Sequence, residues 1–182
     1  MTHIDYDGVP TSSERTYMAA TPTTLACPAG TKSFFVLMGS STKTIKVTRI
    51  HISGLTMTAR AYNNISVRKI SSAPSGGTSS ALVKVSTDTN NDASTINVCQ
   101  VYTVEPTTDG TLVGTLQSNR IQINDTNPVQ GDPQSEIIFN FRDINESSGL
   151  VLHGTSEGIS VGFGTTPASA ITLSIEVEWT ES

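Results

Sequence analysis

The segment from Ile171 to Thr180 constrains the fold more than any other part of the chain. Apolar and polar side chains alternate there without a break. Such a period of two is typical of a β-strand with one face in a core and the other in solvent. A slip of one residue would bury Glu176 and Glu178, so the pattern also determines which face turns inward. The inward positions are Ile171, Leu173, Ile175, Val177 and Trp179.

Shorter segments elsewhere carry strand patterns of the same kind. Ile137, Phe139 and Phe141 alternate with polar neighbours, and we expect them to share a core with the apolar positions of 171–179. Residues 34–38 form a continuous apolar run, which predicts a strand buried on both faces.

Three local features are predicted between these strands. The apolar parity changes between Lys43 and Ser53, which indicates a β-bulge near Thr48 and Arg49. Ser53–Gly54 is expected to form a turn. Residues 111–116 and 120–123 are expected to form the two strands of a hairpin.

Composition and spacing together indicate the fold class. The chain has 182 residues, with 36% hydrophobic and 15% charged residues, and Thr, Ser, Asn and Gly are abundant. About ten strands, with turns every ~8–12 residues, predict an all-β fold, namely an antiparallel, jelly-roll-like β-sandwich. Residues 1–15 are polar without periodicity and are expected to form a flexible N-terminal arm, followed by a single sandwich domain over residues 16–182.

Several classes of protein are disfavoured by simple sequence properties. No apolar run approaches the roughly 18 residues of a membrane span, and residues 1–14 lack the apolar segment of a secretory signal. The net charge of −5 argues against a protein that coats nucleic acid. A Cys27–Cys99 disulfide remains possible, but without an export signal two buried, reduced thiols are expected.

Charge is divided unevenly along the chain. Residues 16–87 carry eight basic side chains and no acidic one, whereas residues 88–182 carry thirteen acidic and two basic side chains. Interleaving the two halves would relieve the repulsion within each. We therefore expect Arg60 and Arg68 to pair with acids of the second half, preferably Glu176 and Glu178, either within one chain or across a subunit boundary.

Two overlapping G-x-S-x-G strings centre on Ser156 and Ser160. In hydrolases such a string places the serine on a sharp strand-to-helix turn. Ser160 lies within an alternating strand pattern, and no helix pattern follows either serine. The histidines His3, His51 and His153 show no metal-ligand spacing. We therefore expect no catalytic site and a chain that is not an enzyme.

Residues 88–92 resemble the beginning of a calcium-binding loop. Asp88, Asn90 and Asp92 match the first three ligand positions, but Ala93 replaces the required glycine and Cys99 the bidentate glutamate. An EF-hand is thus excluded, while a simpler oxygen-ligand site and a turn capped by Asp or Asn remain open. No glycine-rich phosphate loop precedes a helix pattern, so no cofactor is expected.

Half of the chain resembles virion structural proteins of tailed bacteriophages, especially small β-sandwich proteins that decorate capsids or lie at the head and tail. The resemblance rests on the strings KVTRIHISG (46–54), APSGGTS (73–79), YTVEPTTDGTLVGTL (102–116), GLVLHGTSEGISVGF (149–163) and EWTE (178–181). It implies a non-enzymatic role, symmetric assembly with trimers favoured, contact with other virion proteins such as the major capsid protein, and a virion location after synthesis in the host cytoplasm. It carries over no functional residues.

The alternative is a receptor- or carbohydrate-binding module of a tail fibre or surface adhesin. Sugar sites often combine an exposed aromatic ring with polar side chains. Tyr62 has the outward parity, with Arg60 and Asn64 on the same side of the strand. We expect neither nucleic acid nor membrane as a partner in either case.

Overall fold

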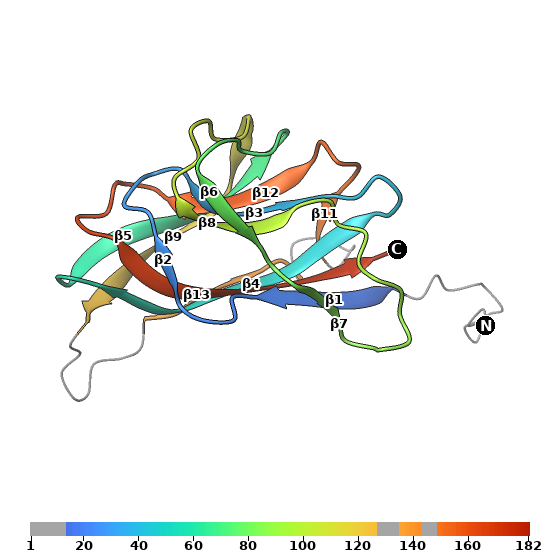
Figure 1. Cartoon of the computed structure of the whole chain (residues 1–182), viewed down its shortest axis with the longest axis horizontal. Helices are drawn as coiled ribbons and strands as arrows, with labels where there is room; N and C mark the ends of the chain where they lie inside the picture. The colour runs from blue at the N-terminus through green and yellow to red at the C-terminus, as the bar shows by residue number, and fades with distance from the viewer. Residues whose placement is uncertain (1–13, 127–134, 143–148) are drawn as a thin grey trace.

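The computed structural model describes residues 14–126, 135–142 and 149–182. These residues form thirteen strands and no helix, which confirms the predicted all-β class (Figure 1). No described segment is a helix with the length and apolarity that crossing a bilayer requires. The strands are β1 (Arg15–Ala20), β2 (Leu25–Cys27), β3 (Ser33–Met38), β4 (Ile45–Met57), β5 (Ala61–Ile70), β6 (Thr78–Ala81), β7 (Lys84–Ser86), β8 (Cys99–Val104), β9 (Leu112–Asp125), β10 (Ile137–Asn140), β11 (Leu150–Leu152), β12 (Gly158–Phe163) and β13 (Ile171–Glu181).

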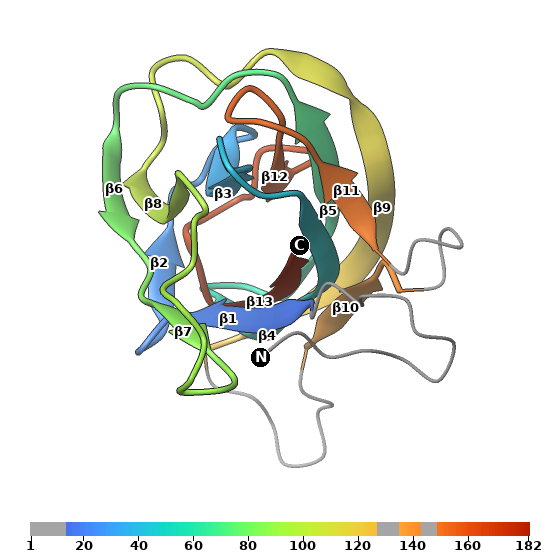
Figure 2. The same cartoon turned by 90° about the vertical axis from the view of Figure 1, so that its right-hand side faces the viewer.

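The strands join into one curled sheet that folds over itself into two layers. The first layer has the order β6-β8-β3-β12-β5-β9, and the second has the order β4-β13-β1-β7, with β10 and β11 on β4 and β2 on β13. Consecutive strands β6 and β7 lie at the two ends of this path, so the chain itself crosses between the layers at one side (Figure 2). At the other side, β9 continues from β5 to β4. The architecture agrees with the predicted sandwich.

One pairing departs from the antiparallel expectation. β9 runs antiparallel to β5 but parallel to β4, where Thr56 pairs with Asn124 and Met57 with Asp125. The parallel contact arises because β9 is long enough to leave the first layer and reach the second.

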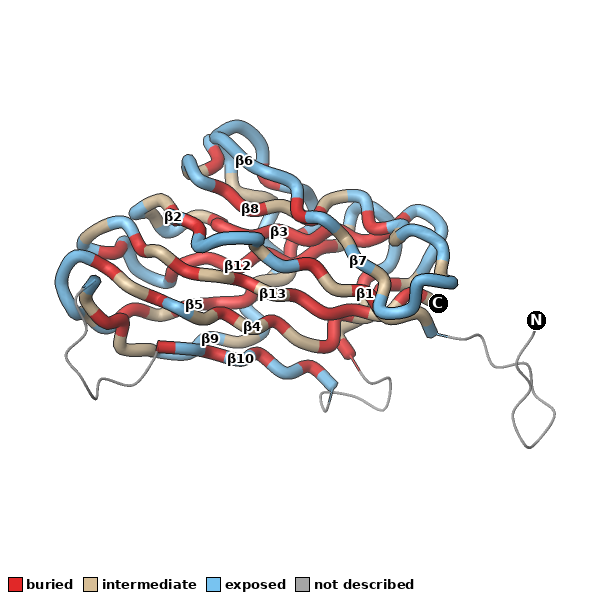
Figure 3. Tube along the Cα trace, turned by 60° about the horizontal axis from the view of Figure 1, so that its bottom comes forward, coloured by how far each residue is buried: buried red, intermediate tan, exposed pale blue. Residues whose placement is uncertain are grey.

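The core lies between the two layers, along β3, β12 and β13 (Figure 3). All five inward positions of β13 are buried, as are Ile137, Phe139 and Phe141, so the predicted common core is confirmed. Every residue of β3 is buried as well. Val36 and Met38 belong to a second, smaller apolar cluster with Ile70 and Tyr102, which explains burial on both faces.

The predicted bulge in β4 is confirmed at Thr48. Glu178 of β13 pairs with Arg49, and Trp179 pairs with Val47, so Thr48 is the extra residue. A bulge of this kind switches the side of the sheet on which later side chains lie, which accounts for the change in apolar parity.

The expected turn at Ser53–Gly54 is wrong. β4 continues to Met57, and its register against β13 shifts between Thr172 and Ser174. Gly54 has φ of 63°, a conformation that glycine adopts without steric penalty, so it forms a second bulge rather than a turn. The chain turns instead at residues 58–60.

The expected hairpin at residues 111–123 is also wrong, because β9 is one strand of 14 residues along β5. The polar residues at 117–119 resembled a turn in sequence. They are tolerated within the strand because this part of β9 is largely exposed. Polar side chains are common on a strand whose faces meet water.

The expected boundary of the N-terminal arm requires a correction. Residues 1–13 lie outside the described residues. Arg15, placed in the arm by the sequence pattern, is the first residue of β1 and pairs with Glu181. Glu14 forms an ion pair with Lys46. The ordered pairing of the chain thus begins before residue 16.

Candidate functional site

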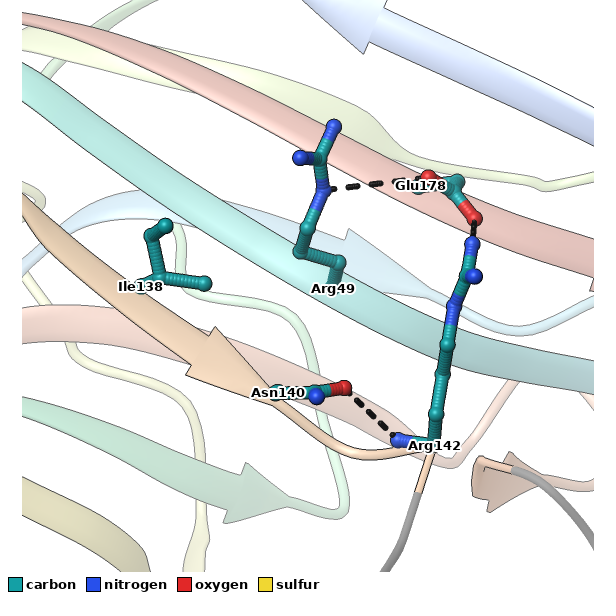
Figure 4. A pocket seen from close by; sticks show the side chains of 5 residues that line it. All are labelled: Arg49, Ile138, Asn140, Arg142 and Glu178. Atoms are coloured by element: carbon teal, nitrogen blue, oxygen red, sulfur yellow. Dashed lines mark hydrogen bonds and ion pairs between the residues drawn. The ribbon is translucent and has the colours of Figure 1, made fainter.

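A shallow polar pocket lies on the outer face of the second layer. Its volume is about 240 Å³, and it is lined by Arg49, Ile138, Asn140, Arg142 and Glu178 (Figure 4). The bulge at Thr48 helps to place Arg49 on this outer face, opposite Glu178. The hydroxyl of Thr48 donates a 3.0 Å hydrogen bond to Glu178 Oε1.

Ion pairs connect the side chains around this pocket. Glu178 forms ion pairs with Arg142 and, at 3.7 Å, with Arg49 Nε, while Arg49 also pairs with Glu176. Asn140 Oδ1 accepts a hydrogen bond of 3.0 Å from the backbone N–H of Arg142. Two guanidinium groups and two carboxylates therefore offset each other's charge. The arrangement is suited to hydrogen bonding with a polar partner surface.

Glu178 departs from its expected exposure. It has the predicted outward parity, but only 9% of the residue is accessible to solvent. Both arginines reach across it, so the outward face of a regular strand is covered by long side chains from neighbouring strands.

Arg68 lies in a different network, on the outer face of the first layer. Its guanidinium is 3.5 Å from Asp109 and donates to the carbonyl oxygens of Thr31 and Phe163 at 3.1 and 2.9 Å. Asp109 also accepts a 2.6 Å hydrogen bond from the hydroxyl of Ser33. The acid beside Arg68 belongs to the second half of the chain, as expected, but it is Asp109 rather than a glutamate of β13. Contacts across a subunit boundary remain a prediction.

Arg60 and Tyr62 lie at the beginning of β5. Arg60 is in the turn before the strand, and the ion pairs described for Glu176 and Glu178 involve Arg49 and Arg142 instead. Tyr62 is 60% exposed, and Arg120 of β9 lies over its ring, with Cζ 4.9 Å from the centroid. The contact between Arg120 and Tyr62 was not predicted from sequence, because the pairing of β9 with β5 was not predicted.

Residues 88–92 form a capped turn. The carboxylate of Asp88 accepts a 2.9 Å hydrogen bond from the backbone N–H of Asn90. Asp92 points to Arg15, with which it forms an ion pair, and its carbonyl oxygen accepts a hydrogen bond of 2.9 Å from Tyr17. Asp88 thus caps the turn, and Asp92 instead joins the turn to Arg15 and Tyr17 of β1. Over residues 14–126, 135–142 and 149–182, no group of three or more His, Cys, Asp or Glu side chains could hold a metal ion.

The G-x-S-x-G string around Ser160 has a packing role in β12. Gly158 lies beneath the sulfur of Met38, and a Cβ at Gly162 would lie 3.1 Å from a guanidinium nitrogen of Arg68. The glycines at 158 and 162 therefore let the long side chains of Met38 and Arg68, from the adjacent strands, cross β12. Ser160 is 1% exposed, and among the described residues its hydroxyl has no hydrogen-bond partner. Ser156 lies in the turn before β12.

Replacing Ser160 with alanine is expected to leave the free energy of unfolding unchanged or slightly raised, because an unpaired buried hydroxyl contributes no hydrogen bond. Urea unfolding of the Ser160→Ala variant checks this.

Neither Ser156 nor Ser160 should be labelled by a fluorophosphonate reagent; covalent labelling of either serine would contradict the expected absence of hydrolase chemistry.

The histidines and cysteines are dispersed over the fold. His51 lies 3.4 Å from Glu136, the backbone N–H of His153 donates to Glu157 at 2.8 Å, and His3 lies outside the described residues. Cys27 and Cys99 are free and buried, and burial raises the pKa of each thiol to about 12. The two cysteines form no disulfide in this structure.

Glu181 was not singled out in the sequence, yet it is one of the most deeply buried charged residues described, at 2% exposed. Its carboxylate accepts hydrogen bonds from Trp179 Nε1 at 3.0 Å, Ser94 Oγ at 2.5 Å and both the hydroxyl and N–H of Thr95. Burial raises the pKa of Glu181, but the hydrogen bonds outweigh it, so the pKa is lowered overall. Glu181 thereby fixes the loop before β8 to the last strand.

β9 also has an edge that no described strand pairs with before Asn124. One edge of β9 pairs with β5, and we call its opposite edge, from Leu112 to Ile121, the free edge. Leu112, Val113 and Leu116 are 58%, 65% and 39% exposed. Unpaired backbone groups beside exposed apolar side chains are a template for an added strand.

No protein-family model matches the chain, and no curated protein matches it either. Among solved structures, the chain aligns with the crystal structure of the infectious bursal disease virus VP2 subviral particle, at 12% identity and a TM-score of 0.20. The alignment covers 94% of this chain and 42% of that one, so the chain spans less than half of its length. Similarity at this TM-score carries no argument about function.

Proposed function

We propose that the chain is a non-enzymatic structural component of a bacteriophage particle, a capsid decoration or head-associated protein that assembles as a symmetric homo-oligomer. The single observation that carries the assembly role is the free edge of β9. The resemblance of the strand-and-turn strings to phage virion proteins supports the location on a particle.

The free edge suits contact with another protein molecule for two reasons. Residues 112–119 contain no charged side chain and no proline, two of the features that block strand addition at an edge. Three exposed apolar side chains lie at its beginning, where a partner would remove them from water. A contact between this edge and a different surface of the next copy gives a ring when the rotation between copies closes, and a ring of three copies is favoured by the family resemblance.

The first test is the mass of the purified chain in solution, by light scattering after size-exclusion chromatography. The chain is expected to be oligomeric, and Leu116→Lys is expected to shift the mass toward the monomer, because it introduces a charge at the free edge. Val83→Lys is the matched control, since Val83 is 76% exposed near β7, away from β9. A monomeric wild-type chain at high concentration would contradict the assembly role.

The location on a particle has its own test. Mass spectrometry of gradient-purified virus particles should detect the chain in a constant ratio to the major capsid protein. Detection only in the soluble fraction of infected cells would argue against a virion component.

A receptor- or carbohydrate-binding role is the second candidate, and the exposure of Tyr62 favours it. The ring is accessible, and Arg120 and Asn64 place polar groups beside it. A glycan array distinguishes the two candidates: binding that is lost in Tyr62→Ala would support this role, whereas an array without binding would leave it unsupported.

A further inference from the structure

We infer that the outer face of β5 and β9, around Tyr62 and Arg120, binds an acidic sugar through its carboxylate. This inference rests on the second candidate role, for which it names the class of ligand, and it is independent of the assembly role. The planar guanidinium of arginine matches the geometry of a carboxylate. Sugar sites often combine an exposed aromatic ring with polar side chains, and both elements occur on this face.

A strip of polar side chains runs along this face. β5 and β9 pair without a register shift from Ala61 to Val67 (Figure 2). Directly opposed residues of an antiparallel pair lie on the same face of the sheet. The outward positions of the two strands therefore form what we call the polar strip, namely Tyr62, Asn64, Ser66, Ser118, Arg120 and Gln122.

The two ends of the polar strip differ in what they offer a ligand. At one end the hydroxyl oxygens of Ser66 and Ser118 lie 3.0 Å apart and share a hydrogen bond. At the other end Tyr62 is 60% exposed, although Arg120 lies over its ring. The part of the ring that Arg120 leaves uncovered can therefore contact the C–H groups of a pyranose.

Arg120 supplies the positive charge of the polar strip. It is exposed, and among the described residues no acidic side chain forms an ion pair with it. Its contact with Tyr62 is a cation–π interaction, which positions the guanidinium without using up its charge. The N–H donors have no acceptor within the described part of the chain, so they are available to a carboxylate.

Arg68 shows how an arginine of the same layer differs when its role is structural. Its side chain is only 16% exposed, and its guanidinium is paired with Asp109. It also donates to the carbonyl oxygens of Thr31 and Phe163. The donors of Arg68 are thus used within the fold, whereas those of Arg120 face solvent.

The local charge favours an anionic ligand over a neutral or cationic one. Residues 61–70 and 112–123 contain no Asp or Glu, although the chain as a whole has a net charge of −5. A carboxylate at the polar strip therefore meets a positive group without a neighbouring acid from either strand segment to repel it.

The remaining groups of the polar strip suit sugar hydroxyls. Asn64 lies opposite Arg120, and Gln122 lies opposite Tyr62. Within the described residues neither side-chain amide forms a hydrogen bond, and an amide can donate to one hydroxyl while accepting from another. Gly164 pairs with the backbone of Asn64 at 2.7 Å and has no side chain to cover this flank.

The test is a titration of the nitrogen-15-labelled full chain, followed by NMR, with two matched pairs of sugars. The pairs are methyl β-glucuronide with methyl β-glucoside, and sialyllactose with lactose. In at least one pair the acidic member should bind about fivefold more tightly than the neutral one, the most that an exposed ion pair typically contributes. Its binding should shift the Arg120 side-chain N–H signal and the amides of residues 62–64 and 120–122. Equal binding of both members in both pairs would overturn the inference.

Sodium acetate tests whether the sugar ring contributes, because it carries the carboxylate alone. Acetate should bind more weakly than the acidic sugar. Acetate that binds as tightly would show a simple anion site and overturn the assignment to a sugar.

Two substitutions on different strands test the roles of the residues. Arg120→Gln should remove the preference for the acidic sugar, and Arg120→Lys should keep part of it, because lysine retains the charge but not the planar fork. Tyr62→Leu should weaken both members of the pair. Arg142→Gln is the control, since it removes a guanidinium from the second layer, and should change neither affinity. A preference that survives in Arg120→Gln would contradict the inference.

The outcomes separate this inference from the proposed roles. The mass of the chain in solution decides the assembly role, whatever the sugars do. Equal binding of acidic and neutral sugars that is lost in Tyr62→Ala would support the second candidate role and overturn the acidic class. An absence of binding to every sugar would overturn this inference and leave the assembly role as it stands.

Discussion

Replacing Ile175 with alanine is expected to lower the free energy of unfolding by about 2–5 kcal/mol, the usual range for truncating a buried aliphatic side chain. Ile175 lies in the middle of β13, is 1% exposed and pairs with Ile52 of β4. It packs in the core between the two layers, so the deleted atoms would leave a cavity that neighbouring strands cannot easily close. Urea unfolding followed by tryptophan fluorescence measures the change, with Trp179 as the reporter.

Ile138→Ala is the matched control for this substitution. Ile138 is also an isoleucine in a strand, but it faces outward from β10 and is 49% exposed. Its truncation should cost less than about 1 kcal/mol, because less apolar surface returns to water. Equal losses in the two variants would show that the inward face of β13 is not the principal core surface.

Replacing Glu181 with alanine is expected to lower the free energy of unfolding by about 3 kcal/mol, because hydrogen bonds to a charged group contribute about 1.5–3 kcal/mol each and their donors would remain buried. The donors are Trp179 Nε1, Ser94 Oγ and the N–H and hydroxyl of Thr95. Glu176→Ala is the control, since Glu176 is partly exposed and pairs with Arg49 at the surface. An exposed ion pair contributes only about 0–1 kcal/mol.

The same carboxylate gives stability a defined pH dependence. The folded-state pKa of Glu181 lies below its ordinary value of 4.5, because the hydrogen bonds favour the ionised form more than burial disfavours it. Its contribution is therefore complete above the unfolded-state pKa and is lost as the pH falls through the folded-state pKa. Glu181→Gln should be less stable than wild type at pH 7, and the difference should shrink below about pH 4.5. A difference that stays constant from pH 7 to pH 3 would contradict this assignment.

The local strand patterns could be read from sequence with good accuracy. Strict alternation predicted the inward face of β13, and the parity change predicted the bulge at Thr48. Both are properties of one strand, and side-chain parity is set by the backbone itself. Gly54 and residues 117–119 misled the prediction, because glycine serves bulges as well as turns and polar residues serve exposed strands as well as loops.

The charged residues of the candidate site show what the sequence alone could not provide. The uneven charge distribution correctly indicated that bases and acids from the two halves would meet, but the partners were set by strand order. Arg49 lies beside Glu178 because β4 pairs with β13 and a bulge turns its side chain outward. Arg68 lies beside Asp109 because the loop before β9 folds over the first layer.

Glu181 and the free edge of β9 were decided by the tertiary structure alone. Glu181 continues the alternation of β13 with inward parity, yet its burial depends on Ser94 and Thr95 folding over the end of the strand. The free edge exists because, among the described strands, β9 is the outermost of its layer for most of its length. The sequence by itself determined which side of each strand turns inward, since that depends on neighbouring residues. Which strands lie side by side depends on contacts between residues far apart in the chain, and these were settled only when the two layers packed together.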